Sequence, residues 1–174
     1  MGEGTRFEMR IPRLITILGF FALSIGCMSK TTDVSTDPIY KGMVGNEFIT
    51  KTDTVAFSFS ESKGHIHLDV FGTTGLPNQK DLPPRLPFEY YDRQILGVLP
   101  QGSTFRIVKV TRWKTFEDSG IDYMAVITSD GPFQGKEMEV TWLAEMTFYP
   151  NVPKFNPKYV EPVKGEISHH RGRL

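Results

Sequence analysis

This 174-residue chain has little of several features that usually guide an interpretation. Its one cysteine, Cys27, has no partner for an intramolecular disulfide, so the fold must be stabilised by the burial of apolar surface. Its 20 basic and 20 acidic side chains leave no net charge, which argues against nucleic-acid binding through a long-range field. The apolar run over residues 14–25 is shorter than the roughly 20 residues that a membrane-spanning helix needs.

Recognisable catalytic patterns are also lacking. The carboxylates are scattered, and there is no Gly-x-Ser-x-Gly stretch that would place a nucleophilic serine on a sharp turn. The glycine pairs within 42–45 and 131–135 lack the strand-to-helix setting of a phosphate-binding loop. We therefore predict a protein that is not an enzyme and that needs no cofactor.

The N-terminal region has the three parts of a secretory signal peptide. Basic residues, ending at Arg13, precede the apolar run over 14–25, and the small residue Gly26 precedes Cys27. A signal peptide is removed during export. The region therefore predicts an exported protein, with residues 1–26 as the signal.

The end of this region resembles the lipobox of bacterial lipoproteins. It departs from the family pattern at one position, because Ser24 stands where leucine is preferred and Leu23 lies one place earlier. The resemblance implies cleavage after Gly26, acylation of Cys27 and anchoring to a lipid bilayer by more than one fatty chain, as stable attachment requires. Because Met28 rather than aspartate follows, the resemblance implies the outer membrane of the cell envelope, facing the periplasm. The alternative for Cys27 is a buried, inert thiol.

Downstream of the signal, composition divides the chain into three parts. Residues 27–43 begin with the lipidated cysteine and are mostly polar, which predicts a flexible tether. Residues 44–149 carry the alternating apolar pattern of a β domain. Residues 150–174 are rich in proline, which predicts an extended arm that packs partly through Phe155 and Tyr159.

Apolar residues in the β domain recur with a period of two, which is the signature of half-buried strands. Residues 103–113 change phase at Ile107, which predicts a β-bulge there. Turn-forming residues at 117–120 and 129–135 predict two hairpins. The predicted inward faces are Val55, Phe57 and Phe59; Ile66, Leu68 and Val70; Ile121, Tyr123, Ala125 and Ile127; and Met138, Val140 and Trp142, with Glu137, Glu139 and Thr141 outside.

Two further features complete the expected architecture. Residues 72–94 contain several prolines, which are excluded from central strands, so they predict a long loop of polyproline character. After residue 27 no window has a helical stripe, and we expect at most one short helical turn.

Residues 95–143 contain Leu99-Pro-Gln-Gly-Ser, then a long alternating strand, a hairpin and a final strand. This pattern resembles bacterial Src-homology-3-like domains, and residues 44–57 resemble the first strand pair of that family. The resemblance implies an all-β fold, either a small Src-homology-3-like barrel or a partly open antiparallel barrel or sandwich. Family members bind peptides or cell-wall material through aromatic grooves, but no binding residue of this chain matches well enough to be assigned by resemblance.

Two sets of side chains are candidates for a site. His65 and His67 alternate on one strand and so project to the same side, as metal ligands can. Asp69 lies about 13 Å from His65 along that strand at roughly 3.3 Å per residue, too far to share an ion. A third ligand would have to come from a distant strand, and the alternative is a solvated outer face.

The second set is aromatic. Tyr90, Tyr91, Trp113 and Phe116, with Phe88, lie in or beside predicted loops, and such residues favour binding interfaces. The alternative is core packing under the long loop.

The preferred function is a membrane-anchored bacterial lipoprotein that acts as a non-catalytic binding or envelope-assembly module. Its partners would be the bilayer, through acylated Cys27, and a peptide, a glycan or an envelope protein, with no nucleic acid. The alternative is a small metal-dependent envelope enzyme that uses His65 and His67.

Overall fold

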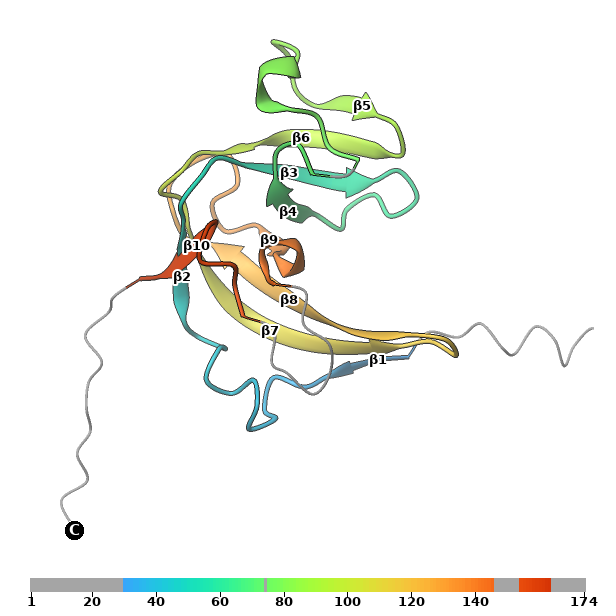
Figure 1. The fold of residues 1–174 in the computed structure, drawn as a ribbon, viewed down its shortest axis with the longest axis vertical. Coiled ribbons are helices and arrows are strands. Elements are labelled where there is room, and N and C mark those ends of the chain that lie inside the picture. Colours follow the sequence, from blue (N-terminus) through green and yellow to red (C-terminus); the bar gives the residue numbers. More distant parts are fainter. Residues whose placement is uncertain (1–29, 74, 146–153, 164–174) are drawn as a thin grey trace, which may run out of the picture.

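The computed structural model describes residues 30–73, 75–145 and 154–163. These residues form an all-β fold with two short 3-10 turns, one more than predicted (Figure 1). The strands are β1 (Lys30–Asp33), β2 (Glu47–Thr50), β3 (Thr54–Phe59), β4 (His67–Val70), β5 (Phe88–Tyr90), β6 (Arg93–Leu99), β7 (Thr104–Lys114), β8 (Ser119–Ile127), β9 (Glu137–Glu139) and β10 (Val160–Pro162), and the turns are η2 (Gln79–Asp81) and η3 (Thr141–Leu143).

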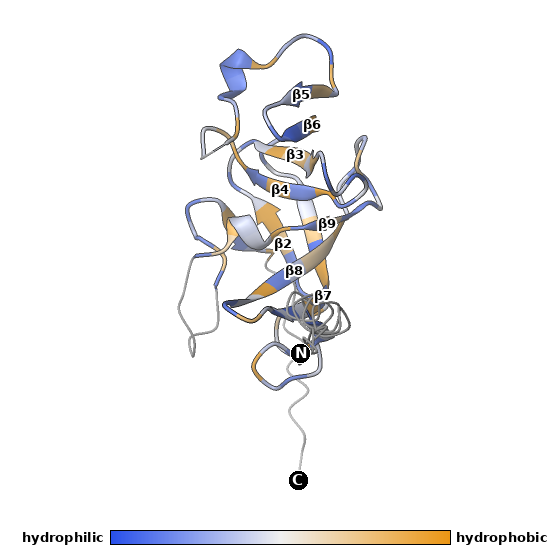
Figure 2. Cartoon of the chain, turned by 90° about the vertical axis from the view of Figure 1, so that its right-hand side faces the viewer, coloured by the Kyte–Doolittle hydropathy of each residue, from blue (hydrophilic) through white to orange (hydrophobic). Residues whose placement is uncertain are grey.

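The strands follow the order β10-β2-β7-β8-β9-β4-β3-β6-β5, and β1 pairs with the far end of β7. The two ends of this path do not pair, so the sheet is largely open. The all-β class is confirmed, but the barrel is not closed. Figure 2 shows β5, β6, β3 and β4 in one layer and β8 and β7 in another, with β9 between them. Every strand pairing is antiparallel except that of β4 with β9.

Two apolar cores lie on opposite faces of β3 and β4. The main core fills the space between the layers and includes Leu68, Phe105, Tyr123 and Met138. The second core consists of Val55, Phe57, Leu76 and Ile95 and is covered by residues from the 71–90 excursion. Because both faces are covered, β4 is buried along its whole length. A strand of alternating sequence usually exposes one face to solvent, but neither face of β4 is exposed.

The β7–β8 hairpin confirms the predicted bulge and turn. Its register shifts between Ile107 and Lys109. The extra residue lets Phe105, Ile107 and Val110 all point into the core, while Val108 is left 38% exposed. The hairpin from β8 to β9 also forms where turn residues predicted it.

Four segments differ from their predicted state. Residues 30–43 of the predicted tether are ordered, because β1 pairs with β7 and both Val34 and Tyr40 are buried. The predicted long loop over 72–94 contains η2, and β5 in it pairs with β6. Strands β2 and β3 do not pair with each other, although residues 44–57 resembled a strand pair. The C-terminal arm packs through Phe155 and Tyr159 as predicted, and it also adds β10 to the edge of β2.

The predicted facing of residues 137–142 is wrong at two positions, Glu139 and Trp142. Strand β9 ends at Glu139 and the chain turns into η3, so the alternation stops there. Met138 and Val140 are buried as predicted, but Trp142 is 46% exposed. Glu139, predicted outside, is buried, and the hydroxyl of Thr141 accepts a hydrogen bond from the Tyr123 backbone N–H.

Candidate metal centre

Both histidines of the His-x-His pair lie at the start of β4. His65 precedes the strand, and its side chain is 44% exposed. His67 is the first residue of β4, and its side chain is only 8% exposed. The prediction of a solvated outer face is therefore wrong for His67 and for Asp69, which is also buried. The cause is the second core, which covers this face of β3 and β4.

Glu139 is the third group at this position. The parallel pairing of β4 with β9 places His67 opposite Glu139, and the Glu139 backbone N–H donates to the carbonyl of Ile66 at 2.7 Å. Because residues that pair across a sheet point to the same face, the Glu139 carboxylate meets both rings. Its Oε2 lies 2.8 Å from His65 Nε2 and 3.3 Å from His67 Nδ1. One carboxylate oxygen thus contacts two imidazole nitrogens.

The contact to His65 is a hydrogen bond, whereas the contact to His67 is not. The Nδ1 atom of His67 is fully buried and has no hydrogen-bond partner. A buried polar atom without a partner costs about 1–3 kcal/mol. The only polar group described beside this nitrogen is the Glu139 carboxylate, 3.3 Å away, with which a protonated His67 forms an ion pair.

Aromatic rings hold His67 in place. Its ring stacks on Phe57 with centroids 5.2 Å apart, and it meets the edge of Phe59 at 5.1 Å. The guanidinium of Arg93 lies 5.1 Å from the centroids of the same two phenylalanine rings. Packing therefore fixes the ring of His67, and the two phenylalanine rings exclude water from that side of the site.

The pKa values of Glu139 and its neighbour Asp122 are shifted in opposite directions. Burial disfavours its charged form, but the neighbouring His67 and His65 outweigh burial and hold the pKa of Glu139 below its ordinary value. Asp122 on β8 has the opposite shift. Partial burial, together with the negative charge of Glu139, raises the pKa of Asp122 to about 6. The indole Nε1–H of Trp113 donates to Asp122 at 3.2 Å.

The donor set fits a divalent transition metal. His65, His67 and Glu139 each offer one ligand atom, and all of these atoms lie within 4.8 Å of one another. Two histidines and one glutamate are a known ligand set for zinc that keeps a fourth position open for water. Tetrahedral bonds of about 2 Å separate ligand atoms by roughly 3.3 Å, which the His67–Glu139 pair already matches. The His65–Glu139 pair would have to lengthen slightly as the ion replaces the shared proton.

Asp69 takes no part in this group. Its carboxylate accepts hydrogen bonds from the Val70 N–H at 2.7 Å and from the Thr73 hydroxyl at 2.9 Å. Burial raises its pKa. The sequence-based conclusion that Asp69 is too far along the strand to complete a site with His65 agrees with this arrangement.

The predicted aromatic set falls into two groups. Phe88, Tyr90 and Tyr91 form a chain of ring contacts, with centroids 6.2 Å and 4.7 Å apart. Trp113 and Phe116 lie in and beside the β7–β8 hairpin instead. Tyr91 is 84% and Phe116 is 93% exposed, whereas Tyr90 and Trp113 are partly buried. Their role in binding stays a prediction, and among the described residues no ring contact joins the two groups.

The signal region and Cys27 lie outside the described residues. Within the described ranges, no helix has the length and apolar character that crossing a membrane would require. No family model, curated protein sequence or solved structure matches the chain.

Proposed function

We propose that this protein is a lipid-anchored protein of the bacterial cell envelope that binds one divalent metal ion of the zinc class. His65, His67 and Glu139 are the ligands. The observation that carries the proposal is the buried Nδ1 of His67, which lacks a hydrogen bond and lies 3.3 Å from a carboxylate oxygen. A bound cation supplies the missing partner for that nitrogen and compensates the buried charge of Glu139.

The anchor is supported by the sequence. The basic start, the apolar run over 14–25 and the lipobox-like end at Cys27 support export and acylation. An exported protein meets metal ions outside the cytoplasm, where free thiols are oxidised. A site built from imidazole and carboxylate is insensitive to that oxidation.

Isothermal titration of zinc into the full chain in detergent tests the metal site. We expect one ion to bind to the parent protein, and binding to be lost in His67→Ala and in Glu139→Gln. Glu137→Gln is the matched control, because Glu137 is an exposed carboxylate on the same strand. A second control replaces His169 and His170, which lie outside the described residues, to remove any binding by the C-terminal histidines. If Glu139→Gln binds zinc as tightly as Glu137→Gln, the proposed site is refuted.

A second candidate function is hydrolysis by a metal-bound water. It is favoured by the open fourth position of a His₂Glu set and by Asp122, whose raised pKa allows it to exchange protons near neutral pH. Zinc-loaded parent protein would then cleave a chromogenic ester faster than zinc-treated Glu139→Gln does. Equal rates for the two proteins would refute hydrolysis at this site and would not affect the proposal of metal binding.

A further inference from the structure

The tip of the β7–β8 hairpin carries the most exposed large apolar side chain in the described part of the chain. Phe116 is 93% exposed, in the turn over 115–118. The turn itself is well defined, because the Thr115 N–H donates to the Asp118 carbonyl at 2.7 Å. The turn therefore holds the Phe116 ring in water, away from both apolar cores.

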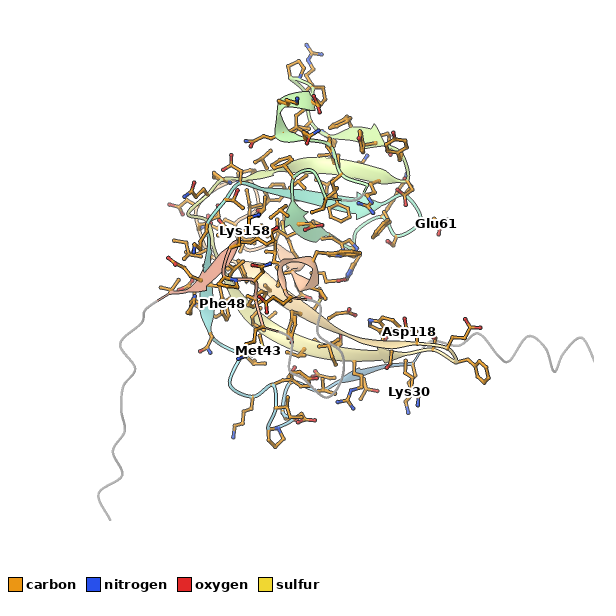
Figure 3. All side chains as sticks on the ribbon, viewed as in Figure 1. Lys30, Met43, Phe48, Glu61, Asp118 and Lys158 are labelled. Carbon is orange, nitrogen blue, oxygen red and sulfur yellow. The ribbon has the colours of Figure 1, made fainter. Side chains whose placement is uncertain are left out.

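The register of β1 relates this tip to the proposed anchor. Lys30 pairs with Lys114, and Lys114 pairs with Ser119 at the base of the turn. Figure 3 shows the labelled Lys30 and Asp118 at the same end of the molecule. Strand β1 therefore runs along the hairpin, and its N-terminal end lies beside the tip.

Chain connectivity then limits the distance from the tip to the lipid. Lys30 is three Cα–Cα steps from Cys27, so the two Cα atoms lie at most about 11 Å apart, whatever path the chain takes. Lys30 is one strand spacing, about 5 Å, from Lys114, and Phe116 is two residues further along. The Cα atom of Cys27 is thus within about 23 Å of the Cα atom of Phe116. Ordered pairing of 30–33 removes the slack that a flexible tether would give.

The composition of the tip suits a membrane surface. Exposed Lys30 and Lys114 offset the exposed Glu117 and Asp118, so no net charge repels the headgroups. Aromatic side chains with lysines beside them are typical anchors at the boundary between headgroups and acyl chains. The tip presents such a ring beside Lys30, which is three positions from the proposed anchor in the sequence.

We infer that the tip of the β7–β8 hairpin, through Phe116, inserts into the lipid surface to which Cys27 anchors the chain. This inference rests on the anchor in the proposed function but not on the metal site. It makes the domain lie on the bilayer in a fixed orientation. It also fixes the orientation, relative to the headgroups, of β8, which carries Asp122 and pairs through Met124 with Glu139 of the candidate metal centre.

The single native cysteine makes the test direct. Once Cys27 is acylated, a cysteine introduced elsewhere is the only free thiol and takes an environment-sensitive fluorophore, nitrobenzoxadiazole. The full-length acylated protein carrying Phe116→Cys or Tyr91→Cys is labelled and reconstituted into vesicles of phosphatidylethanolamine and phosphatidylglycerol. Tyr91 is the matched control, because it is a similarly exposed aromatic residue in a turn, outside the β7–β8 hairpin.

We expect a blue shift and a rise in emission for the label at position 116 and neither for the label at position 91. If both labels report water while the protein floats with the vesicles, the anchor stands and the insertion is refuted. Labelling of the parent chain at Cys27, together with loss of flotation, would refute the anchor and the insertion with it. Zinc titration of the same samples reports on the metal site independently.

Discussion

Replacement of Asp122 by asparagine should stabilise the metal-free protein at neutral pH. Asp122 is a partly buried carboxylate near Glu139, and its pKa is raised from 3.8 to about 6. A pKa that is higher in the folded state than in the unfolded state means that the fold disfavours the charged form. Asparagine keeps the shape and the oxygen that accepts the Trp113 N–H, but carries no charge.

The sign and size of the stability change follow from the linkage between proton binding at Asp122 and folding. Between about pH 4 and pH 6 the folded protein holds a proton at Asp122 that the unfolded chain has released, so this group makes stability fall as pH rises through that window. A rise of this size corresponds to about 3 kcal/mol for a fully buried group. Because water reaches Asp122, we expect about 1 kcal/mol at pH 7 and little effect at pH 4.

Urea unfolding of the full chain in detergent, with a chelator present, measures this difference at pH 4 and pH 7. Asp122→Asn should unfold at a higher urea concentration than the parent at pH 7 only. Glu137→Gln, on the same sheet but exposed, should change stability equally at both values. Zinc should reduce the gain but not abolish it, because the ion offsets the charge of Glu139 while Asp122 stays partly buried. A gain of equal size at pH 4 and pH 7 would show that the electrostatic account of Asp122 is mistaken.

Two further measurements examine the site and its support. Zinc at 100 times its dissociation constant should stabilise the parent protein by about 2.7 kcal/mol, seen as a higher melting temperature, and should leave Glu139→Gln unchanged; a shift in that variant would place the ion elsewhere. Gly120→Ala should destabilise by about 1–3 kcal/mol, because a Cβ there would lie 2.5 Å from an indole carbon of Trp113. Gly42→Ala, where a Cβ meets nothing within 4 Å, is the control, and equal urea midpoints for the two variants would contradict the packing argument.

Local pattern was sufficient for the strands and hairpins of the sheet. The alternation over 121–127 and the phase change at Ile107 predicted β8 and the bulge in β7, because both depend on which side chains a single strand must bury. The packing of Phe155 was also predicted, since a large apolar ring in a polar arm has few alternatives. These features are properties of short segments.

Two of the three residues of the candidate metal centre could be recognised from the sequence. His65 and His67 were recognised from their spacing, but Glu139, 74 residues from His65, was assigned to the wet face of its strand. That assignment assumed a sheet with one buried face. Glu139 is buried because the second core covers that face of the sheet and because β4 and β9 pair in parallel. Neither feature can be recognised from the residues next to Glu139 in the sequence.

The same distinction applies to the N-terminal part of the domain. Residues 30–43 are polar, which predicted a tether. However, β1 pairs with β7 through backbone hydrogen bonds, and these do not depend on which side chains the segment carries. Sequence alone determined that the chain is β-rich, and the acylation of Cys27 stays a prediction. Tertiary structure decided which faces are dry, which carboxylate meets the histidines and where β1 is held, because each of these depends on contacts between segments that are distant along the chain.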